Sequence, residues 1–200
     1  MTSISASNPP TCHRLSSSAA VSIFSNRLVA IGLSLLTVLA LTGCAGPDPV
    51  QYQSQKPALD LRQYFNGELT GWGMVQNRSG QVDRRFVVTI KASWNGDQGI
   101  LDEQFDWSDG EKQRRVWRIR VAGPNRYIGT ADDVEGEAIG EVYGNALRWR
   151  YTLNVPFRGR QIGLDFDDWM LLIDDKVMLN RAVFSKWGIR MGEVTLSFKK

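Results

Sequence analysis

Residues 83–94 read DRRFVVTIKASW and alternate between apolar and polar side chains. The even positions are Arg84, Phe86, Val88, Ile90, Ala92 and Trp94, and all of them except Arg84 are apolar. The odd positions are mostly polar, and they include Arg85, Thr89, Lys91 and Ser93. Because successive side chains of a β-strand point to opposite faces of the sheet, this stretch predicts a strand with one apolar face and one polar face.

The same alternation returns in two later stretches. In residues 111–121 one phase holds Arg115, Trp117, Ile119 and Val121, and the other holds Arg114, Arg118 and Arg120. In residues 146–155 one phase holds Leu147, Trp149, Tyr151 and Leu153, and the other holds Arg148, Arg150 and Thr152. Asn95-Gly96 and Asp109-Gly110 separate such runs, and these dipeptides are typical of hairpin turns.

These patterns predict an all-β fold, with an antiparallel meander of about eight to ten strands after a short helix over residues 58–65. The expected strands are residues 66–76, 83–94, 99–107, 112–121, 126–133, 136–143, 146–155, 161–173, 176–185 and 189–199. We expect the meander to form a lipocalin- or calycin-like barrel, or a strongly curved sheet, with its apolar face inward. A porin would instead carry its apolar belt on the outer wall.

The N-terminal region contains a 14-residue apolar run, Leu28–Leu41, that leads into Gly43 and Cys44. A membrane-spanning helix needs about 20 residues, so the run fits the apolar core of a secretory signal better. The sequence Leu41-Thr42-Gly43-Cys44 is similar to the bacterial lipoprotein signal, which implies cleavage before Cys44 and lipidation of that residue. Because Ala45 and not aspartate follows the cysteine, the resemblance implies an outer-membrane lipoprotein that faces the periplasm.

We therefore expect three regions. Residues 1–43 are the leader and signal peptide, which is removed. Residues 44–57 are the lipidated cysteine and a Pro- and Gln-rich tether, and residues 58–200 are the β-barrel domain. The partners expected from this arrangement are the membrane, through the anchor on Cys44, and an envelope protein.

The composition excludes several kinds of chemistry after residue 43. His13 is the only histidine and Cys12 the only cysteine besides Cys44. Residues 44–200 therefore have no histidine- or cysteine-based catalysis, no zinc site built from these two residue types and no internal disulfide. The leader removes Arg14 and Arg27 and no acid, so the 24 basic residues fall to 22 against 21 acidic ones, a net charge of +1. We therefore expect no metal, no cofactor and no nucleic-acid partner.

Four charged residues fall on the apolar phase of their strands: Arg84, Glu103, Arg115 and Asp168. An unpaired buried charge costs several kcal/mol, so these groups must pair with each other, meet a ligand or lie at a barrel mouth. Two interpretations stay open, either an arginine pair that receives a ligand carboxylate or headgroup, or internal ion pairs that set the strand register.

Two acidic doublets, Asp132-Asp133 and Asp167-Asp168, invite an interpretation as carboxylate pairs. Neighbouring strand residues point to opposite faces, so we predict that neither doublet is a pair in space. Gly136, Ala138 and Gly140 place small residues on one face, where they either make room for a ligand or let the barrel bend.

Three long stretches carry a resemblance to a known family: YFNGELTGWGMVQNRSGQVDRRF, GTADDVEGEAIGEVYGNALRWRYTL and LDFDDWMLLIDDKVMLNRAVFSKWGIRMGEVTLSF. They resemble the bacterial putative-lipoprotein family known as domain of unknown function 3833, over nearly all of residues 57–200. The family has no established activity, so the resemblance implies no catalytic residue. It does associate the chain with membrane lipid modification or transport.

From these observations we expect a barrel that binds a fatty acyl or other amphipathic ligand, and a binding protein rather than an enzyme. The acyl chain would lie against Phe86, Trp94, Trp117, Trp149 and Phe166, with its acid end at Arg84 or Arg115. The candidate ligand-binding residues are Arg84, Arg115, Glu103, Asp133, Asp168, Arg181, Trp94, Trp117 and Trp149.

Two alternatives belong to other classes. One is a carboxylate-based isomerase or hydratase, with Asp133 or Asp168 as the base and Arg181 or Lys186 stabilising an oxyanion. The other is a structural or assembly lipoprotein with a filled barrel and an exposed apolar patch for an envelope protein. Acids that converge in a pocket would favour the first alternative.

Overall fold

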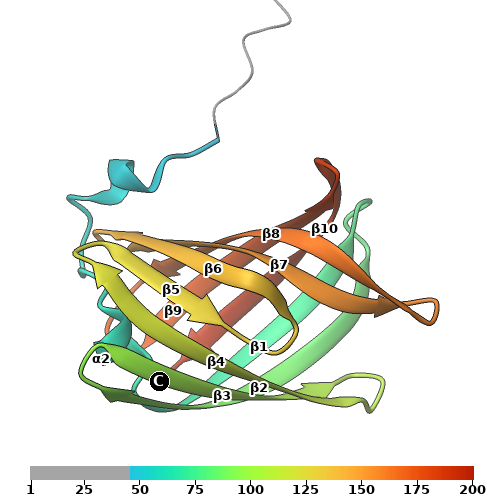
Figure 1. Cartoon of the computed structure of the whole chain (residues 1–200), viewed down its shortest axis with the longest axis horizontal. Helices are drawn as coiled ribbons and strands as arrows, with labels where there is room; N and C mark the ends of the chain where they lie inside the picture. Colours follow the sequence, from blue (N-terminus) through green and yellow to red (C-terminus); the bar gives the residue numbers. More distant parts are fainter. Residues whose placement is uncertain (1–45) are drawn as a thin grey trace, which may run out of the picture. The chain divides into compact units, whose positions relative to one another are not determined.

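A computed structural model describes residues 46–200, so the predicted leader and Cys44 lie outside the described residues. Figure 1 shows two short helical segments followed by strands that wrap into a barrel. The helical segments are η1 (Pro49–Tyr52) and α2 (Leu61–Tyr64). The strands are β1 (Gly67–Asn77), β2 (Val82–Asn95), β3 (Gln98–Trp107), β4 (Lys112–Gly123), β5 (Arg126–Thr130), β6 (Val134–Tyr143), β7 (Ala146–Phe157), β8 (Arg160–Leu172), β9 (Val177–Lys186) and β10 (Ile189–Lys199).

The ten strands form one closed antiparallel barrel. Each strand pairs with the next in the chain, and β1 pairs with β10 to complete the ring. Closure leaves no sheet edge with unpaired backbone groups. The predicted all-β meander and the lipocalin-like barrel are therefore confirmed.

The inner wall is the apolar phase that the sequence predicts. On β2, for example, Phe86, Val88, Ile90 and Ala92 are all buried. Full burial of an aliphatic or aromatic side chain contributes about 1.5–3 kcal/mol, and here ten strands share one such core. At the β2–β3 turn, Gly96 has a φ of +60°, which glycine adopts without strain.

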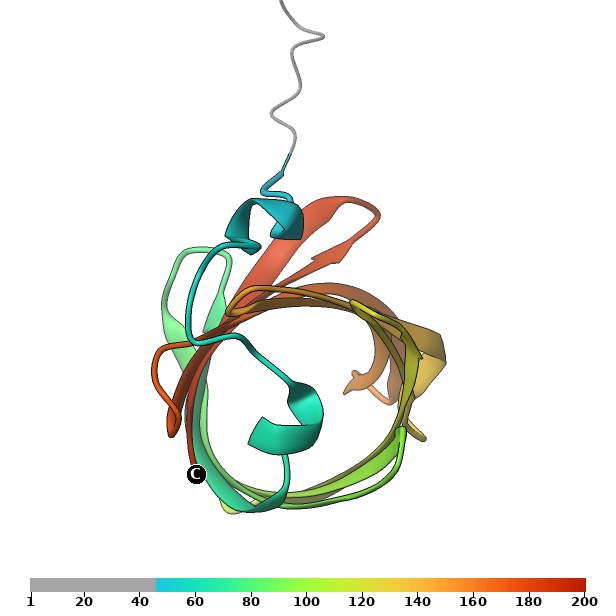
Figure 2. The same cartoon turned by 90° about the vertical axis from the view of Figure 1, so that its left-hand side faces the viewer.

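The helix α2 covers one end of the barrel, as the end-on view in Figure 2 shows. Asp60 begins the helix, because its side chain accepts a hydrogen bond from the backbone N–H of Arg62 at 2.9 Å. Leu61, Tyr64 and Phe65 are buried in the barrel core. The Tyr64 hydroxyl donates to the carbonyl of Lys176 at 3.1 Å, so polar as well as apolar contacts hold α2 at this end of the barrel.

Residues 47–57, which the sequence predicts as part of a tether, lie on the barrel and do not extend away from it. Asp48 caps η1 by accepting from the backbone N–H of Val50 at 3.0 Å. The ring of Tyr52 lies 5.9 Å from that of Trp169 on β8, measured between ring centroids. A Cβ at Gly144 would collide with the carbonyl of Tyr52, so a glycine is needed where this segment crosses the β6–β7 turn. The buried apolar residues that the structure describes form one core cluster between Leu59 and Phe198, so residues 46–200 contain a core of their own.

Within residues 46–200, neither helical segment has the length and apolar character that crossing a membrane would require.

Candidate functional site

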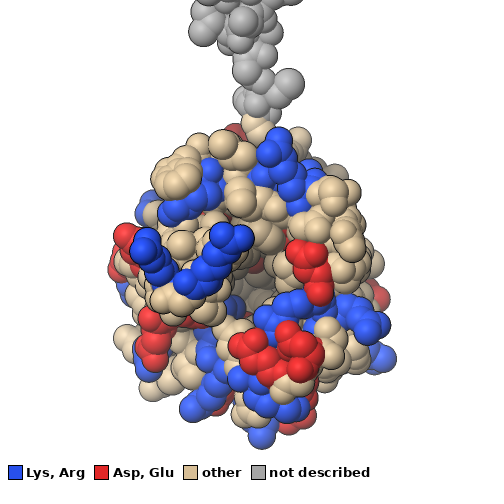
Figure 3. Space-filling view, turned by 90° about the vertical axis from the view of Figure 1, so that its right-hand side faces the viewer, with Lys and Arg blue, Asp and Glu red and all other residues tan. Residues whose placement is uncertain are grey.

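The barrel encloses a cavity of about 500 Å³. Leu61 and Phe65 of the α2 region close one end of it. Figure 3 looks at the opposite end, where a hollow opens between basic and acidic side chains. The volume of the cavity falls in the range of about 300–1,000 Å³ that is usual for small-molecule sites.

Aromatic side chains form much of the cavity wall. Trp117 packs edge-on against Trp149 and against Tyr151, with ring centroids 5.7 and 5.4 Å apart. Tyr151 in turn stacks on Phe166 at 5.0 Å. Trp117, Trp149, Phe86 and Phe166 all line the cavity, as the strand phase predicts.

Small residues on β5 and β6 make this wall possible. A Cβ at Gly140, or at Gly129 on the neighbouring strand, would collide with the indole of Trp149. Ala138, which lies opposite Gly129 in the strand register, is fully buried. Gly136 has a φ of +67° beside an irregularity in the β6–β7 register. Of the two interpretations of this stripe, the structure favours room for a core tryptophan and a bend over direct room for a ligand.

A polar cluster interrupts the apolar wall. Arg115 on β4 lies directly opposite Glu103 on β3 in the strand register, and its Nη1 is 3.8 Å from Glu103 Oε2. Its Nε donates to both carboxylate oxygens of Asp133, at 3.0 and 2.9 Å, and its Nη2 lies 2.8 Å from Oδ2. Asp168 on β8 lines the same cavity and accepts a hydrogen bond from the amide of Asn180 on β9.

Burial changes the acid strength of this cluster. It raises the pKa of Glu103 to about 7, although the nearby Arg115 opposes the change. It also raises the pKa of Asp168 to about 7, against the effect of the hydrogen bond from Asn180. For Arg115, burial alone lowers the pKa, but the carboxylates of Asp133 and Glu103 more than offset this and raise it. Burial raises the pKa of the Tyr151 hydroxyl well above its ordinary value, so it stays protonated as a donor.

Arg84 is at the end of the cavity away from α2. It pairs with two acids of the β3–β4 turn, Asp109 through Nε at 2.8 Å and Glu111 through Nη2 at 2.8 Å. Its guanidinium lies over the ring of Trp107, 4.1 Å from the centroid. Both arginines expected to receive a ligand carboxylate therefore already hold carboxylates of the protein.

Both acidic doublets are split in space, as predicted, although Asp132-Asp133 lies in the turn after β5 and not in the expected strand 126–133, because β5 ends at Thr130. Asp133 and Asp168 face the cavity. Asp132 pairs with Arg118 at 3.5 Å and Asp167 with Arg148 at 2.7 Å, both outside the barrel. The cavity therefore collects acids from the β5–β6 connection and β8 that are 35 residues apart in the chain.

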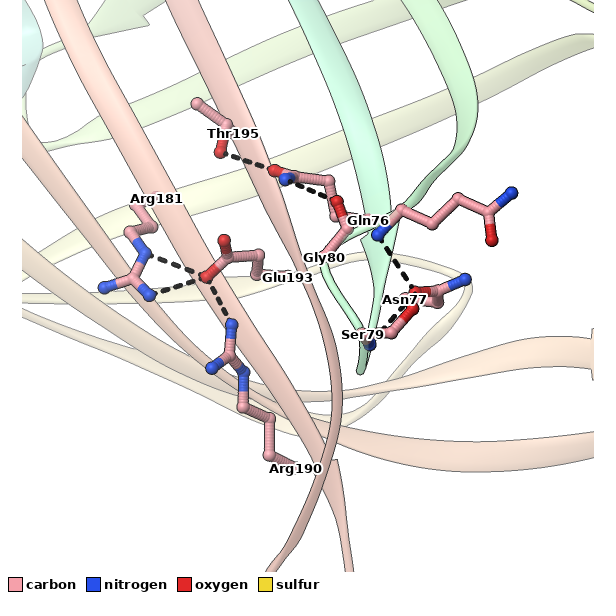
Figure 4. Close-up of polar contacts among 9 residues, drawn as sticks. Gln76, Asn77, Ser79, Gly80, Arg181, Arg190, Glu193 and Thr195 are labelled. Atoms are coloured by element: carbon pink, nitrogen blue, oxygen red, sulfur yellow. Dashed lines mark hydrogen bonds and ion pairs between the residues drawn. The ribbon is translucent and has the colours of Figure 1, made fainter.

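Three of the residues that the sequence predicts for the site do not line the cavity: Trp94, Arg181 and Lys186. This corrects the prediction that they lie together with Arg115, Asp133 and Asp168. Trp94 faces inward but lies at the α2 end, where its indole N–H donates to the carbonyl of Phe65 at 2.8 Å. Arg181 is on the outer phase of β9 and pairs with Glu193 at 2.6 Å; Figure 4 shows it there beside Arg190. Lys186 donates to the carbonyl of Gly163 at 2.6 Å.

Sequence reasoning missed Asn180. It is 5% exposed, and it lies on the same phase of β9 as the buried residues Met178 and Ala182. A polar side chain on that apolar phase was the available signal.

The outer wall carries a second concave region over β8, β9, β10, β1 and β2. Trp72, Val87 and Leu179 are exposed in it, and Arg85 and Arg181 accompany them. Strand pairing places Trp72 beside Val87, and Ser197 stands between Trp72 and Leu179, so the exposed apolar residues form one band that a serine interrupts.

Comparisons with known proteins agree with this fold. The family model described as protein of unknown function DUF3833 matches residues 38–200. The S-type phycobiliprotein lyase CPES from Guillardia theta is similar in structure, with a TM-score of 0.53 and 6% sequence identity, over 76% of this chain and 97% of that one. A DUF3598 protein of unknown function from Nostoc punctiforme gives a TM-score of 0.50 and 16% identity, over 78% of this chain and 53% of that one. These likenesses show the fold alone, and a search of curated proteins finds no match.

Proposed function

We propose that this protein, a member of the DUF3833 family of unknown function, binds a small amphipathic molecule inside its barrel. The observation that carries the proposal is the cavity of about 500 Å³, with aromatic and aliphatic walls and one buried polar cluster. A large apolar pocket with a few convergent polar groups is the usual form of a small-molecule site.

The apolar part of the ligand is best explained as an acyl chain. Phe86, Trp117, Trp149 and Phe166 line the cavity, while Trp94 does not and is left out of the site. Each methylene group moved from water into such walls contributes about 0.8 kcal/mol. A chain of ordinary length therefore supplies much of the free energy that micromolar binding needs, against the entropy cost of association.

The carboxylate-enzyme alternative is less well supported. Acids do converge in the cavity, and Glu103 and Asp168 have the pKa near 7 that suits proton transfer. However, Arg181 pairs with Glu193 on the outer wall and Lys186 does not line the cavity. Neither of these two residues is therefore placed to stabilise an oxyanion in the cavity.

We also propose that Cys44 carries the lipid anchor and holds the barrel at the periplasmic face of the outer membrane, where it serves lipid modification or transport. The support is the sequence Leu41-Thr42-Gly43-Cys44 after a short apolar run. Intact-mass analysis of the membrane-extracted protein should show loss of residues 1–43 and added acyl mass. A Cys44→Ala protein should lack both changes, and an unprocessed wild-type chain would contradict the anchor.

Mass spectrometry under native conditions tests the binding function. Residues 46–200, purified without detergent from cells, should carry a co-purified amphiphile that organic extraction releases. Ala182 lines the cavity and Val183 does not, so Ala182→Phe should lose the bound molecule and Val183→Phe should keep it. A wild-type protein that stays empty after incubation with mixed membrane lipids would refute the proposal.

In that outcome the exposed band on the outer wall, with Trp72 at its centre, becomes the candidate contact for an envelope protein.

A further inference from the structure

The charges inside the cavity do not balance. Among the described residues, Arg115 is the only cation of the polar cluster, and it faces three carboxylates, those of Glu103, Asp133 and Asp168. Arg115 donates from Nε to both carboxylate oxygens of Asp133, and its Nη2 contacts the same carboxylate. The closer of the two remaining acids, Glu103, is 3.8 Å away from the same guanidinium.

Asp168 has no cation of its own. It is 6% exposed and lines the cavity, and its hydrogen-bond partner is the neutral amide of Asn180. No lysine or arginine in the part of the chain that the structure describes forms an ion pair with it. A buried carboxylate without a counterion is costly, so this site favours anything that supplies a positive charge or a proton.

We infer that the polar end of the ligand is a cation, an amine or a quaternary ammonium group, held between Glu103 and Asp168. The inference rests on the proposed binding function and specifies its ligand class. It replaces the expected acid end at Arg84 or Arg115, because a ligand carboxylate would have to displace Asp133 from Arg115, or Asp109 and Glu111 from Arg84.

The aromatic wall supports the same class of headgroup. Trp117, Tyr151 and Phe166 line the cavity together with the two acids. The faces of such rings attract cations, and quaternary ammonium groups in particular are held by aromatic cages. Arg115 itself lies over the ring of Phe105 at 5.5 Å, which shows a cation already accommodated in this wall.

The protonation state of the cluster follows from every group around it. Glu103 is affected by Arg115, Asp133, Asp168 and the indole of Trp117, and Asp168 is affected by Asn180, Asp167 and Tyr151. Since burial brings the pKa of both acids to about 7, each is neutral in acid and charged in mild alkali. Cation binding should therefore strengthen as the pH rises.

Three probes that share a twelve-carbon alkyl chain distinguish the effect of headgroup charge from that of the alkyl chain. They are dodecyltrimethylammonium, dodecanoate and 1-dodecanol, each used below its critical micelle concentration. Tryptophan fluorescence of residues 46–200 reports binding, because Trp117 and Trp149 line the cavity. At about pH 8 the ammonium probe should bind about tenfold more tightly than dodecanoate, and at about pH 5.5 this preference should fall severalfold. Binding of the neutral alcohol should change little with pH.

Variants assign the effect to the cluster. Glu103→Gln and Asp168→Asn should each weaken ammonium binding about tenfold and leave dodecanol binding within about twofold. Asp102→Asn removes an acid one position from Glu103 on the outer wall, where it pairs with Arg114, and it should leave both unchanged. Retained dodecanol binding shows that a variant is still folded.

The outcomes separate the two proposals. Binding of dodecanoate at least as tight as that of the ammonium probe overturns the cation inference and leaves the binding function intact. Ammonium binding that survives in the double variant Glu103→Gln/Asp168→Asn also overturns it. Failure of all three probes overturns the binding function, and the inference with it.

Discussion

Adjacent residues on opposite faces of the barrel have very different surroundings. Arg114 is on the outer wall, 64% exposed, and pairs with Asp102 at 2.7 Å, whereas Arg115 is on the inner wall, 13% exposed, and holds Asp133 and Glu103. Asp167 and Asp168 repeat the contrast, one paired with Arg148 outside and the other buried beside Asn180. A step of one residue along a strand thus separates a solvated ion pair from a buried charge cluster.

The difference shows that residue type alone does not decide what a charge contributes. Outer pairs are screened by water and contribute about 0–1 kcal/mol each. Inner groups have lost their hydration, so removal of one partner leaves the others unpaired in a low-dielectric cavity. Substitutions on the two walls should therefore differ in their effects.

We expect the largest loss of stability when the inner arginine, Arg115, is replaced. At neutral pH, Arg115→Leu should lower the free energy of unfolding by about 3–5 kcal/mol, because Asp133 and Glu103 lose their counterion. Arg114→Leu should lower it by about 1 kcal/mol or less. Urea denaturation of both variants measures this, and equal effects would mean that the two walls do not differ as described.

The next effect is the dependence of stability on pH. Burial raises the pKa of Glu103 from 4.5 to about 7 and that of Asp168 from 3.8 to about 7, so between these values the folded protein binds more protons than the unfolded chain. Their stabilising contribution is therefore complete below about pH 4 and is lost as the pH rises through about 7.

Glu103→Gln and Asp168→Asn should each flatten that slope, by an amount on the order of 1–3 kcal/mol across the window. Asp102→Asn is the control on the outer wall, where it pairs with Arg114, and should leave the slope as it is. Denaturation curves collected from about pH 4 to about pH 8 make the comparison. A slope unchanged in both inner variants would argue against buried, protonated carboxylates.

The smallest effect concerns two glycines. Gly140→Ala should destabilise the barrel by about 1–3 kcal/mol, because its Cβ would collide with the indole of Trp149 on the inner wall. Gly163→Ala should cost less, since its Cβ would meet only the Thr152 methyl at 3.1 Å and side-chain oxygens. Thermal melting of the two variants ranks them, and the reverse order would contradict the packing described.

The sequence by itself determined the strands, their faces and the splitting of the Asp167-Asp168 doublet on β8. These features follow from the period-two alternation, which is a local property of an extended chain and is visible in stretches such as residues 83–94. It also placed Glu103, Arg115 and Asp168 on the inner face, since each shares its phase with aromatic and aliphatic neighbours.

Only the tertiary structure decided which of these residues meet. Closure of β1 on β10 and the stagger between strands set the height of each inward residue along the barrel. That height separates Trp94, at the α2 end, from Arg115 and Asp133, and it brings Asn180 to Asp168. Strand phase gives the face of a residue but not its height, because height depends on hydrogen-bond register between strands that are distant in the sequence.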